Sequence, residues 1–340
     1  MLQDYDHIIA IDYAERNIAI ARLTRKAKKP QVIEGCYAVK DLQEYLKNLK
    51  GTKFLTIEET TTAQWLYCEL RNYVDRMLIC DPHRNRLLSS GPKNDPIDAG
   101  KLALLARAGL LKEVYHSTDK LVHLRRLVSA YQDMVVAGVR LKNQKSALYR
   151  QAGKSYRAGE PLTEPHTAFI LDRLNCGIEK YEEVKDEYIR EFKKAKRADK
   201  RLKRLCKVPG IDIIGAVKVL AMVIDARRFK KSGKYLAYCG LVLYCKDSGK
   251  RSYGKRRPRY CRVLKCVYKT AAMAMMHGSS DMSEYYYMLL DRGVAEHNAR
   301  HAMARQIAVA TYGMLKHDTA YKPYLWRNYI EQKSKLIRIP

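Results

Sequence analysis

The stretch HIIAIDYAERNIAIARL (residues 7–23) decides how the first part of this 340-residue chain folds. Two apolar runs, Ile8–Asp12 and Asn17–Leu23, flank a short link, YAER. Isoleucine-rich runs of this length favour β-strands, and a short link between two of them is typical of a β-hairpin. The stretch therefore predicts two antiparallel strands, the first of which ends in a carboxylate, Asp12.

The next segments alternate between strand and helix patterns. Residues 31–39 (QVIEGCYAV), 53–59 (KFLTIEE) and 76–80 (RMLIC) have the composition of strands. Between them, residues 42–49 (LQEYLKNL) have helical spacing, and a second helix is predicted from about Thr61 to Val74. An antiparallel meander followed by alternating helices and strands predicts a mixed α/β sheet.

From Asp95 onward the pattern is mainly helical. Apolar residues recur at heptad-like spacing over residues 124–148 and 171–192, and a Gly- and Pro-rich connection separates the two stretches. An antiparallel helical hairpin and an intermolecular coiled coil both fit this pattern. The last third is also expected to be helical, with the basic segment 246–262 interrupting it. The predicted boundaries are 1–110 for the α/β domain, 111–195 for the helical coiled coil or linker, 196–325 for a C-terminal domain and 326–340 for a tail.

Positive charge is concentrated in one part of the chain. The formal net charge is +29; residues 191–262 carry 23 Lys and Arg against 5 Asp and Glu, whereas residues 1–110 carry 17 against 14. A localised excess of this size predicts a polyanionic partner, with nucleic acid as the default. The residues expected to contact its phosphates are Lys193, Lys194, Lys196 and Arg197 in one cluster, and Lys246, Lys250, Arg251, Lys255, Arg256, Arg257 and Arg259 in a second.

The segment VPGIDIIGAVKVL (208–220) has two interpretations. It is similar to a helix-hairpin-helix element, in which the turn amides around Gly210 would hold a nucleic-acid phosphate at a helix N terminus. An ordinary packing corner between two helices fits it equally well.

Carboxylates follow two of the predicted strands and open one predicted helix. Asp12 ends the first strand, Glu58 and Glu59 end a later one, and Asp95 and Asp98 lie one helical turn apart. Gathered at one sheet edge, such acids repel one another unless a cation neutralises them. Mg²⁺ or Mn²⁺ prefers oxygen ligands of this kind, and two such ions assist phosphodiester chemistry.

The pair Asp95 and Asp98 also has a purely structural interpretation. Asp95 as the N-cap, Pro96 at the first helical position and Asp98 near the capping-box site make a good helix start. Taken alone, the pair is explained by this interpretation, and the metal hypothesis depends on the whole set of acids.

The expected compartment is a reducing cytoplasm. The nine cysteines form no C-x-x-C pair, and free, mostly buried thiols are the simplest account of them. The first residues, MLQDYD, are acidic where a secretory signal would be basic, and no uncharged run is long enough to cross a membrane.

Several motifs together resemble one family. They are IAIDYAERNIAI (9–20), IEETTT (57–62), KNDPIDA (93–99), VPGIDIIGA (208–216), YCGLVLYCKDSGKRSYG (238–254) and ARQIAVATYGMLK (304–316). In this order they are similar to the DEDD transposases of a prokaryotic insertion-sequence family, also called bridge-RNA-guided recombinases and related to Piv DNA invertases. The resemblance covers nearly the whole chain.

The resemblance implies a fold and a set of acids. It implies a RuvC-like (ribonuclease H-like) domain followed by a helical hairpin and a mainly helical C-terminal transposase domain. The family's D…E…D-x-x-D acids correspond to Asp12, Glu58, Asp95 and Asp98, as catalytic residues and ligands of Mg²⁺ or Mn²⁺. Glu58 is preferred over Glu59 because the family pattern is Ile-Glu-x-Thr.

The resemblance also implies a nucleophile, Ser248, in the Ser-Gly pair that follows Gly-Leu. This serine would attack a DNA phosphodiester and form a covalent phosphoserine, with Lys246, Lys250 and Arg251 as a phosphate cradle. The sequence departs from the family afterwards, because RPRYCRVLKC (257–266) lacks the Gly of the usual Ser-Lys-x-Gly.

The function that these observations predict is DNA recombination or transposition. The expected partners are double-stranded target and donor DNA, and the resemblance adds a structured guide RNA and a homo-oligomer in which dimers pair into a tetramer. The acids and the serine are expected to meet across subunits. Alternatives are a Piv-like invertase, a metal-only junction nuclease and a non-catalytic RNA-binding scaffold. An actin- or Hsp70-like kinase is disfavoured because no Gly stands near Ala14.

Overall fold

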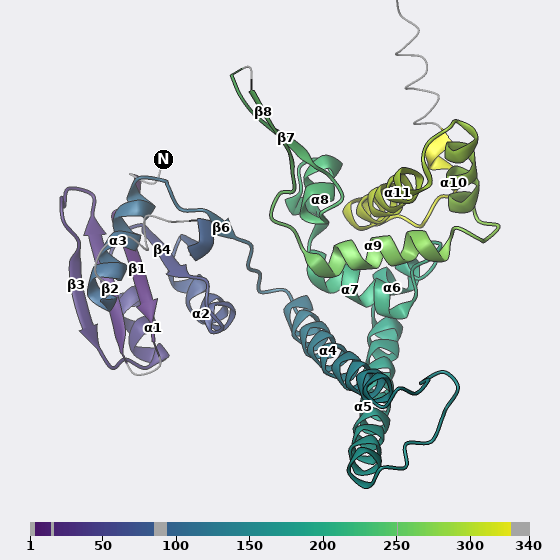
Figure 1. Cartoon of the computed structure of the whole chain (residues 1–340). Helices are drawn as coiled ribbons and strands as arrows, with labels where there is room; N and C mark the ends of the chain where they lie inside the picture. The colour runs from purple at the N-terminus through teal and green to yellow at the C-terminus, as the bar shows by residue number, and fades with distance from the viewer. Residues whose placement is uncertain (1–3, 15–16, 85–93, 250, 328–340) are drawn as a thin grey trace, which may run out of the picture. The chain divides into compact units, whose positions relative to one another are not determined.

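The structure, a computed structural model, describes residues 4–14, 17–84, 94–249 and 251–327 (Figure 1). The chain divides into two compact units, Met1–Asp119 and Lys120–Pro340, which are described separately. The finer division into four segments stays a prediction.

The first unit is built on a six-stranded sheet with the strand order β3-β2-β1-β4-β5-β6. The predicted hairpin is confirmed: β1 pairs with β2 in antiparallel register, and β2 pairs with β3. The next two strands, β4 and β5, run parallel to β1, and β6 closes the edge in antiparallel pairing with β5. The strands are β1 (His7–Tyr13), β2 (Ile18–Thr24), β3 (Gln31–Gly35), β4 (Lys53–Glu58), β5 (Arg76–Cys80) and β6 (Glu113–Val114).

Helices cover both faces of this sheet. Alternation along β1 and β2 sends isoleucines such as Ile9 and Ile11 to one face, where they pack against α1 (Val39–Asn48) and α2 (Ala63–Leu70). The other face carries small residues, including Ala10, Ala19 and Ala21, and packs against α3 (Asp95–Arg107). These alanines let α3 approach the sheet closely. The helix predicted to reach Val74 is shorter, because α2 gives way to a 3-10 turn, η2 (Arg71–Tyr73).

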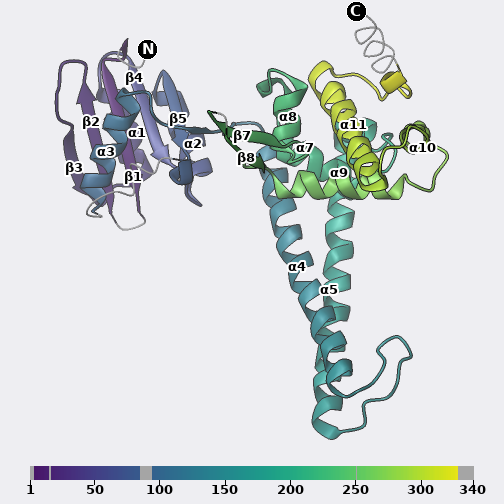
Figure 2. The same cartoon turned by 45° about the horizontal axis from the view of Figure 1, so that its top comes forward.

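The second unit begins with a long helical hairpin formed within one chain. Its helices, α4 (Leu121–Gln151) and α5 (Pro165–Ala198), run antiparallel (Figures 1 and 2). The Tyr131 ring lies 5.7 Å from Tyr188 and 5.2 Å from Phe192, measured between ring centroids. Of the two arrangements that the heptad pattern allowed, the intrachain hairpin is the one found.

The rest of the second unit is helical, as predicted, around the almost fully buried helix α7. A chain of hydroxyl groups joins three helices inside it: Tyr268 Oη lies 2.5 Å from Tyr235 Oη and 2.8 Å from Thr311 Oγ1. The helices are α6 (Lys200–Leu205), α7 (Ile213–Val223), α8 (Ser232–Tyr238), α9 (Arg262–Ala274), α10 (Asp281–Asp291) and α11 (Glu296–His317), with short 3-10 turns such as η3 (Pro82–Arg84) and η5 (Ala226–Arg228) elsewhere in the chain.

The basic interruption forms a two-stranded antiparallel ribbon, β7 (Tyr244–Ser248) and β8 (Arg251–Arg256), which Figure 1 shows beside α8. Gly249, in the turn, has φ +59°, a conformation that favours glycine. The sequence analysis predicted only a break between helices here.

The cysteines are less buried than expected. Five of the nine are exposed and only Cys80 and Cys239 are buried, so the prediction of mostly buried thiols is wrong. No helix among the described residues is long and apolar enough to cross a membrane.

Candidate active site

The first two acids lie at the same end of neighbouring parallel strands. Asp12 is the penultimate residue of β1 and Glu58 the last residue of β4, and the strands pair Ile11 with Ile57 immediately before them. Because side chains alternate along a strand, both acids share the face of Ala10, which is the face that α3 covers. The carboxylates therefore approach the N-terminal end of α3.

The other two acids lie on the first turn of α3, at Asp95 and Asp98. Burial raises the pKa of Asp12 to about 6, and the negative charges of Asp95, Glu58 and Asp98 add to this effect. The structure thus brings three of the acids within electrostatic range of the fourth, the half-buried Asp12.

The capping interpretation of Asp95 and Asp98 does not hold in detail. The N-cap of α3 is Asn94, without a side-chain capping bond, and Asp95 is already a helical residue. The Asp98 carboxylate instead accepts a hydrogen bond from Lys101 Nζ at 3.2 Å, one turn further along the helix. The capping prediction misplaced the helix start by one residue, a common error because Asn and Asp are equally good caps.

The neighbouring Glu59 has a different role from Glu58. Glu59 directly follows β4, and its side chain points to the face of the sheet opposite to that of Glu58. There Glu59 Oε2 lies 2.5 Å from His116 Nε2. The other ring nitrogen, Nδ1, lies 2.8 Å from Gln64 Oε1, and Gln64 Nε2 donates to the Ser117 carbonyl at 2.9 Å. Both ring nitrogens therefore lie within hydrogen-bond distance of side-chain oxygens.

His116 was missed by the sequence analysis. Its side chain is only 6% exposed and its ring centroid lies 5.7 Å from that of Tyr67. Fifty-seven residues separate it from Glu59, and no local pattern marks the pairing.

The four acids are a charge cluster rather than a finished ligand cage. Among the described residues, no three His, Cys, Asp or Glu side chains are gathered closely enough to hold a metal ion as they stand. The donor set nevertheless fits a hard divalent cation, because carboxylate oxygens are its preferred ligands, and burial together with the neighbouring negative charges raises the pKa of Asp12.

Ser248 belongs to the second unit, as the last residue of β7. Its backbone pairs with Arg251 across the turn of the ribbon. Lys246 also lies on β7, and the predicted contact Lys250 lies outside the described residues.

The basic side chains of β8 face solvent. All six residues of this strand are exposed, including Arg251, Lys255 and Arg256. Arg257 and Arg259, which follow the strand, are exposed as well. Every ribbon side chain that the structure describes is therefore exposed, and those of β8 present a row of cations.

The other predicted basic cluster lies in the last turns of α5. Lys193, Lys194 and Arg197 are exposed near the end of α5, where Lys194 pairs with Glu191 at 2.6 Å. Lys196 lies beside Cys206, and there it opposes the rise in the pKa of the thiol that burial causes.

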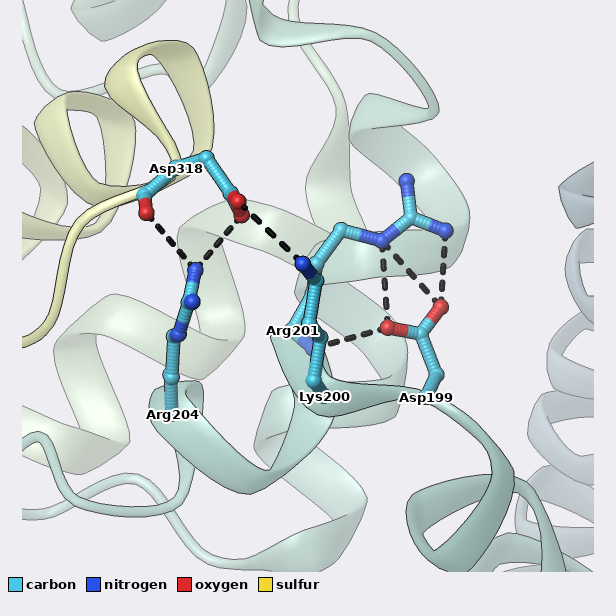
Figure 3. Close-up of polar contacts among 5 residues, drawn as sticks. All are labelled: Asp199, Lys200, Arg201, Arg204 and Asp318. Atoms are coloured by element: carbon cyan, nitrogen blue, oxygen red, sulfur yellow. Dashed lines mark hydrogen bonds and ion pairs between the residues drawn. The ribbon is translucent and has the colours of Figure 1, made fainter.

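Three cations that follow Asp199 have carboxylate partners within the second unit: Lys200, Arg201 and Arg204. Arg204 donates to Asp318 Oδ1 at 2.5 Å, and Lys200 Nζ lies 3.6 Å from Asp318 Oδ2 (Figure 3). Arg201 Nη2 donates to Asp199 at 2.7 Å. The contacts of Arg204 and Lys200 with Asp318 fix α6 to the end of α11, so these two cations have a structural role.

Gly210 lies in the turn between α6 and α7, with φ +76°. A Cβ there would lie 2.5 Å from the Ala271 carbonyl oxygen, so α9 packs directly against this turn. The Asp212 carboxylate caps α7 by accepting from Gly215 N at 2.6 Å. These contacts explain the turn as a packing corner, and its phosphate contact stays a prediction.

Comparisons with known proteins match both units. A family model for the DEDD transposases of IS110 matches residues 9–152, which include all four acids. A second model, described as the transposase IS116/IS110/IS902 family, matches residues 202–287, which include Ser248.

Individual relatives are distant. An uncharacterized 44.8 kDa protein of insertion element IS116 from Streptomyces clavuligerus is 24% identical over 51% of this chain and 43% of its own length. The transposase for insertion sequence element IS1111A from Coxiella burnetii is 22% identical over 73% of each chain, and a probable family 20 transposase from Pseudomonas aeruginosa is 31% identical over 37% of this chain and 39% of its own. The chain thus spans less than half of the IS116 relative. Because the two family models together match more than half of the sequence in chain order, this chain belongs to the IS110/IS116/IS902 family of transposases.

Proposed function

We propose that this protein is an insertion-sequence transposase that cuts and rejoins DNA. The observation that carries the proposal is the convergence of Glu58, Asp95 and Asp98 on the half-buried Asp12. Two relatives that are named transposases, that of IS1111A and that of Pseudomonas aeruginosa, support the same activity.

The first unit is proposed to be a RuvC-like, ribonuclease H-like domain. An antiparallel meander, β1 to β3, continued by the parallel strands β4 and β5, supports this assignment. The acids lie at strand ends and at a helix start beside them, where sites of mixed α/β sheets usually form.

Asp12, Glu58, Asp95 and Asp98 would hold the divalent metal that a DEDD transposase domain implies, with Mg²⁺ or Mn²⁺ as the proposed ion. Such an ion stabilises negative charge that develops on phosphate oxygens during phosphodiester cleavage. Lys101, which donates to Asp98, adds one positive charge beside the acids.

Ser248 is the proposed nucleophile. Its Oγ forms a bond to the DNA phosphorus, the bond from that phosphorus to one sugar oxygen breaks, and the sugar oxygen takes up a proton as the serine loses one. Attack by the sugar hydroxyl of a second strand reverses these bonds and restores the serine. A covalent intermediate of this kind conserves the phosphodiester energy, so strands are exchanged without free ends.

The exposed ribbon and the end of α5 are the proposed nucleic-acid contacts. A two-stranded β-ribbon fits the major groove of duplex DNA, and the cations of β8 and of Arg257 and Arg259 would bind its phosphates. The proposal also includes a guide RNA and a cytoplasmic location. The protein would form dimers that pair into a tetramer, in which different subunits supply the acids and the serine.

Asp12→Asn and Ser248→Ala test the proposal on a plasmid that carries the element's ends and flanking DNA. Both variants should abolish strand exchange, and only the wild type should form a covalent protein–DNA adduct that survives denaturing electrophoresis. Full exchange by Asp12→Asn would favour a protein without metal chemistry. Cleavage by Ser248→Ala at the wild-type rate would favour the metal-only nuclease.

A further inference from the structure

A basic pocket lies between α9 and α11, outside the residues discussed so far. Its volume is about 220 Å³, and its lining residues are Lys269, Met273, His297, Arg300 and His301. Lys269 and Met273 are one turn apart on α9, and the other three lie on the first two turns of α11. Since these helices pack along one another, both contribute to one cavity.

The lining has cationic and imidazole groups but no carboxylate among the described residues. The Arg300 guanidinium, 39% exposed, has Glu296 at 3.8 Å on its own helix, a weak surface pair. This one weak pair with Glu296 offsets only part of the repulsion between Lys269 and Arg300. The arrangement therefore points to an anion.

Cations lie around His301 on both helices that line the pocket. Burial lowers the pKa of His301, and Lys269, Arg305, Arg257 and Lys265 lower it further by repulsion. Lys265 and Lys269 lie on α9, Arg305 on α11, and Arg257 directly follows the basic ribbon. The pocket thus continues the row of cations that begins on β8.

The size of the cavity limits the ligand. Sites for whole small molecules have volumes of roughly 300–1,000 Å³, so this pocket is too small for a nucleotide cofactor. One phosphate with part of its sugar fits better. Met273, whose side chain is 59% exposed, offers an apolar contact for the sugar beside the cations.

We propose that the α9–α11 pocket binds one phosphate of a nucleic-acid backbone, which runs from the basic ribbon along α9. This inference rests on the proposed function, since it assumes a nucleic-acid substrate or guide. It places one phosphate of that backbone at a defined position on the second unit, with Lys269 and Arg300 as the main phosphate contacts.

The double variant Lys269→Met with Arg300→Gln removes both charges and keeps most of the side-chain length. The matched control is Lys180→Met with Arg173→Gln, which makes the same charge change at exposed positions of α5. Dissociation constants are measured for a labelled duplex DNA and for a labelled single-stranded RNA at several salt concentrations, on the Ser248→Ala background so that no cleavage intervenes.

The pocket variant should bind at least one of these nucleic acids about tenfold more weakly, and the salt dependence of its log affinity should fall by about one. Lys269→Arg should keep the affinity. A loss on DNA alone, on RNA alone or on both supports the proposal and identifies the source of the phosphate. An effect on neither, or one equal to that of the α5 control, overturns it. These affinity measurements do not depend on the strand-exchange assays of Ser248→Ala and Asp12→Asn, so the two proposals can fail independently.

Discussion

His116 Nε2 lies 2.5 Å from Glu59 Oε2, so the glutamate next to a proposed metal ligand already has a basic partner. The two neighbouring acids leave β4 toward opposite faces. Glu58 contributes to the negative surroundings of Asp12, whereas Glu59 connects the end of β4 to the segment around Ser117 through His116 and Gln64. This division of roles answers which of the two acids belongs to the acidic cluster.

Glu58→Gln and Glu59→Gln should therefore differ in kind. Glu58→Gln should reduce strand exchange by at least a hundredfold, because it removes one of the proposed metal ligands. Glu59→Gln should keep most of the activity and lower the free energy of unfolding by about 1–2 kcal/mol, since a charge-assisted hydrogen bond becomes a neutral one. Exchange assays and urea unfolding measure the two effects. If Glu59→Gln lost activity as Glu58→Gln does, the assignment of Glu58 would be wrong.

Asp12 makes stability depend on pH and on metal. Its pKa in the folded protein, about 6, is above the value of an unfolded aspartate, so the ionised carboxylate opposes folding. This cost is present above pH 6 and disappears as the pH falls through 6 toward 4. Asp12→Asn should therefore stabilise the metal-free protein at pH 7.5 by about 1–2 kcal/mol, after screening of a half-buried group is allowed for, and by less at pH 4.5.

The effect of added divalent metal on stability should also differ between the wild type and Asp12→Asn. Mg²⁺ or Mn²⁺ should raise the melting temperature of the wild type at pH 7.5 and should have little effect on Asp12→Asn. Equal stabilisation of both proteins would place the metal elsewhere.

The helical hairpin has one position with no room for a side chain. A Cβ at Gly138 on α4 would overlap the ring of Tyr181 on α5, and Lys142 and Lys185 approach that ring within 5.0 and 5.8 Å of its centroid. Gly138→Ala should lower the free energy of unfolding by about 1–3 kcal/mol through overpacking. Gly313→Ala on α11 is the control: nothing lies within 4 Å of its Cβ, and alanine there should stabilise the helix by up to about 1 kcal/mol. Thermal and urea unfolding of the full chain measure both, and similar changes in the two variants would contradict the close packing.

The features of the structure that can be predicted from sequence are those formed by residues close together in the chain. The hairpin of β1 and β2, the parallel strands and α3 follow from apolar alternation and helical spacing, which are local signals. The convergence of Asp12 and Glu58 follows next, because parallel neighbouring strands bring their ends together. His116 beside Glu59 and Lys269 beside Arg300 could not be predicted, since each pairing joins distant segments through tertiary packing alone. The ribbon was missed because its strands have charged rather than alternating apolar residues.

The ribbon also allows the proposed nucleophile to be tested against a second serine close to the same turn. Ser248 and Ser252 lie on opposite strands of the ribbon, close to the turn; Ser248 pairs with Arg251, and Ser252 with Asp247. Ser248→Ala should remove the covalent protein–DNA adduct and lower strand exchange by at least a thousandfold, because it removes the proposed nucleophile. Ser252→Ala, with the same loss of one hydroxyl group, should keep both, and DNA affinity should be unchanged in the two variants because the cations remain. Denaturing gels of labelled DNA detect the adduct, and an adduct that persists in Ser248→Ala but disappears in Ser252→Ala would move the nucleophile across the turn.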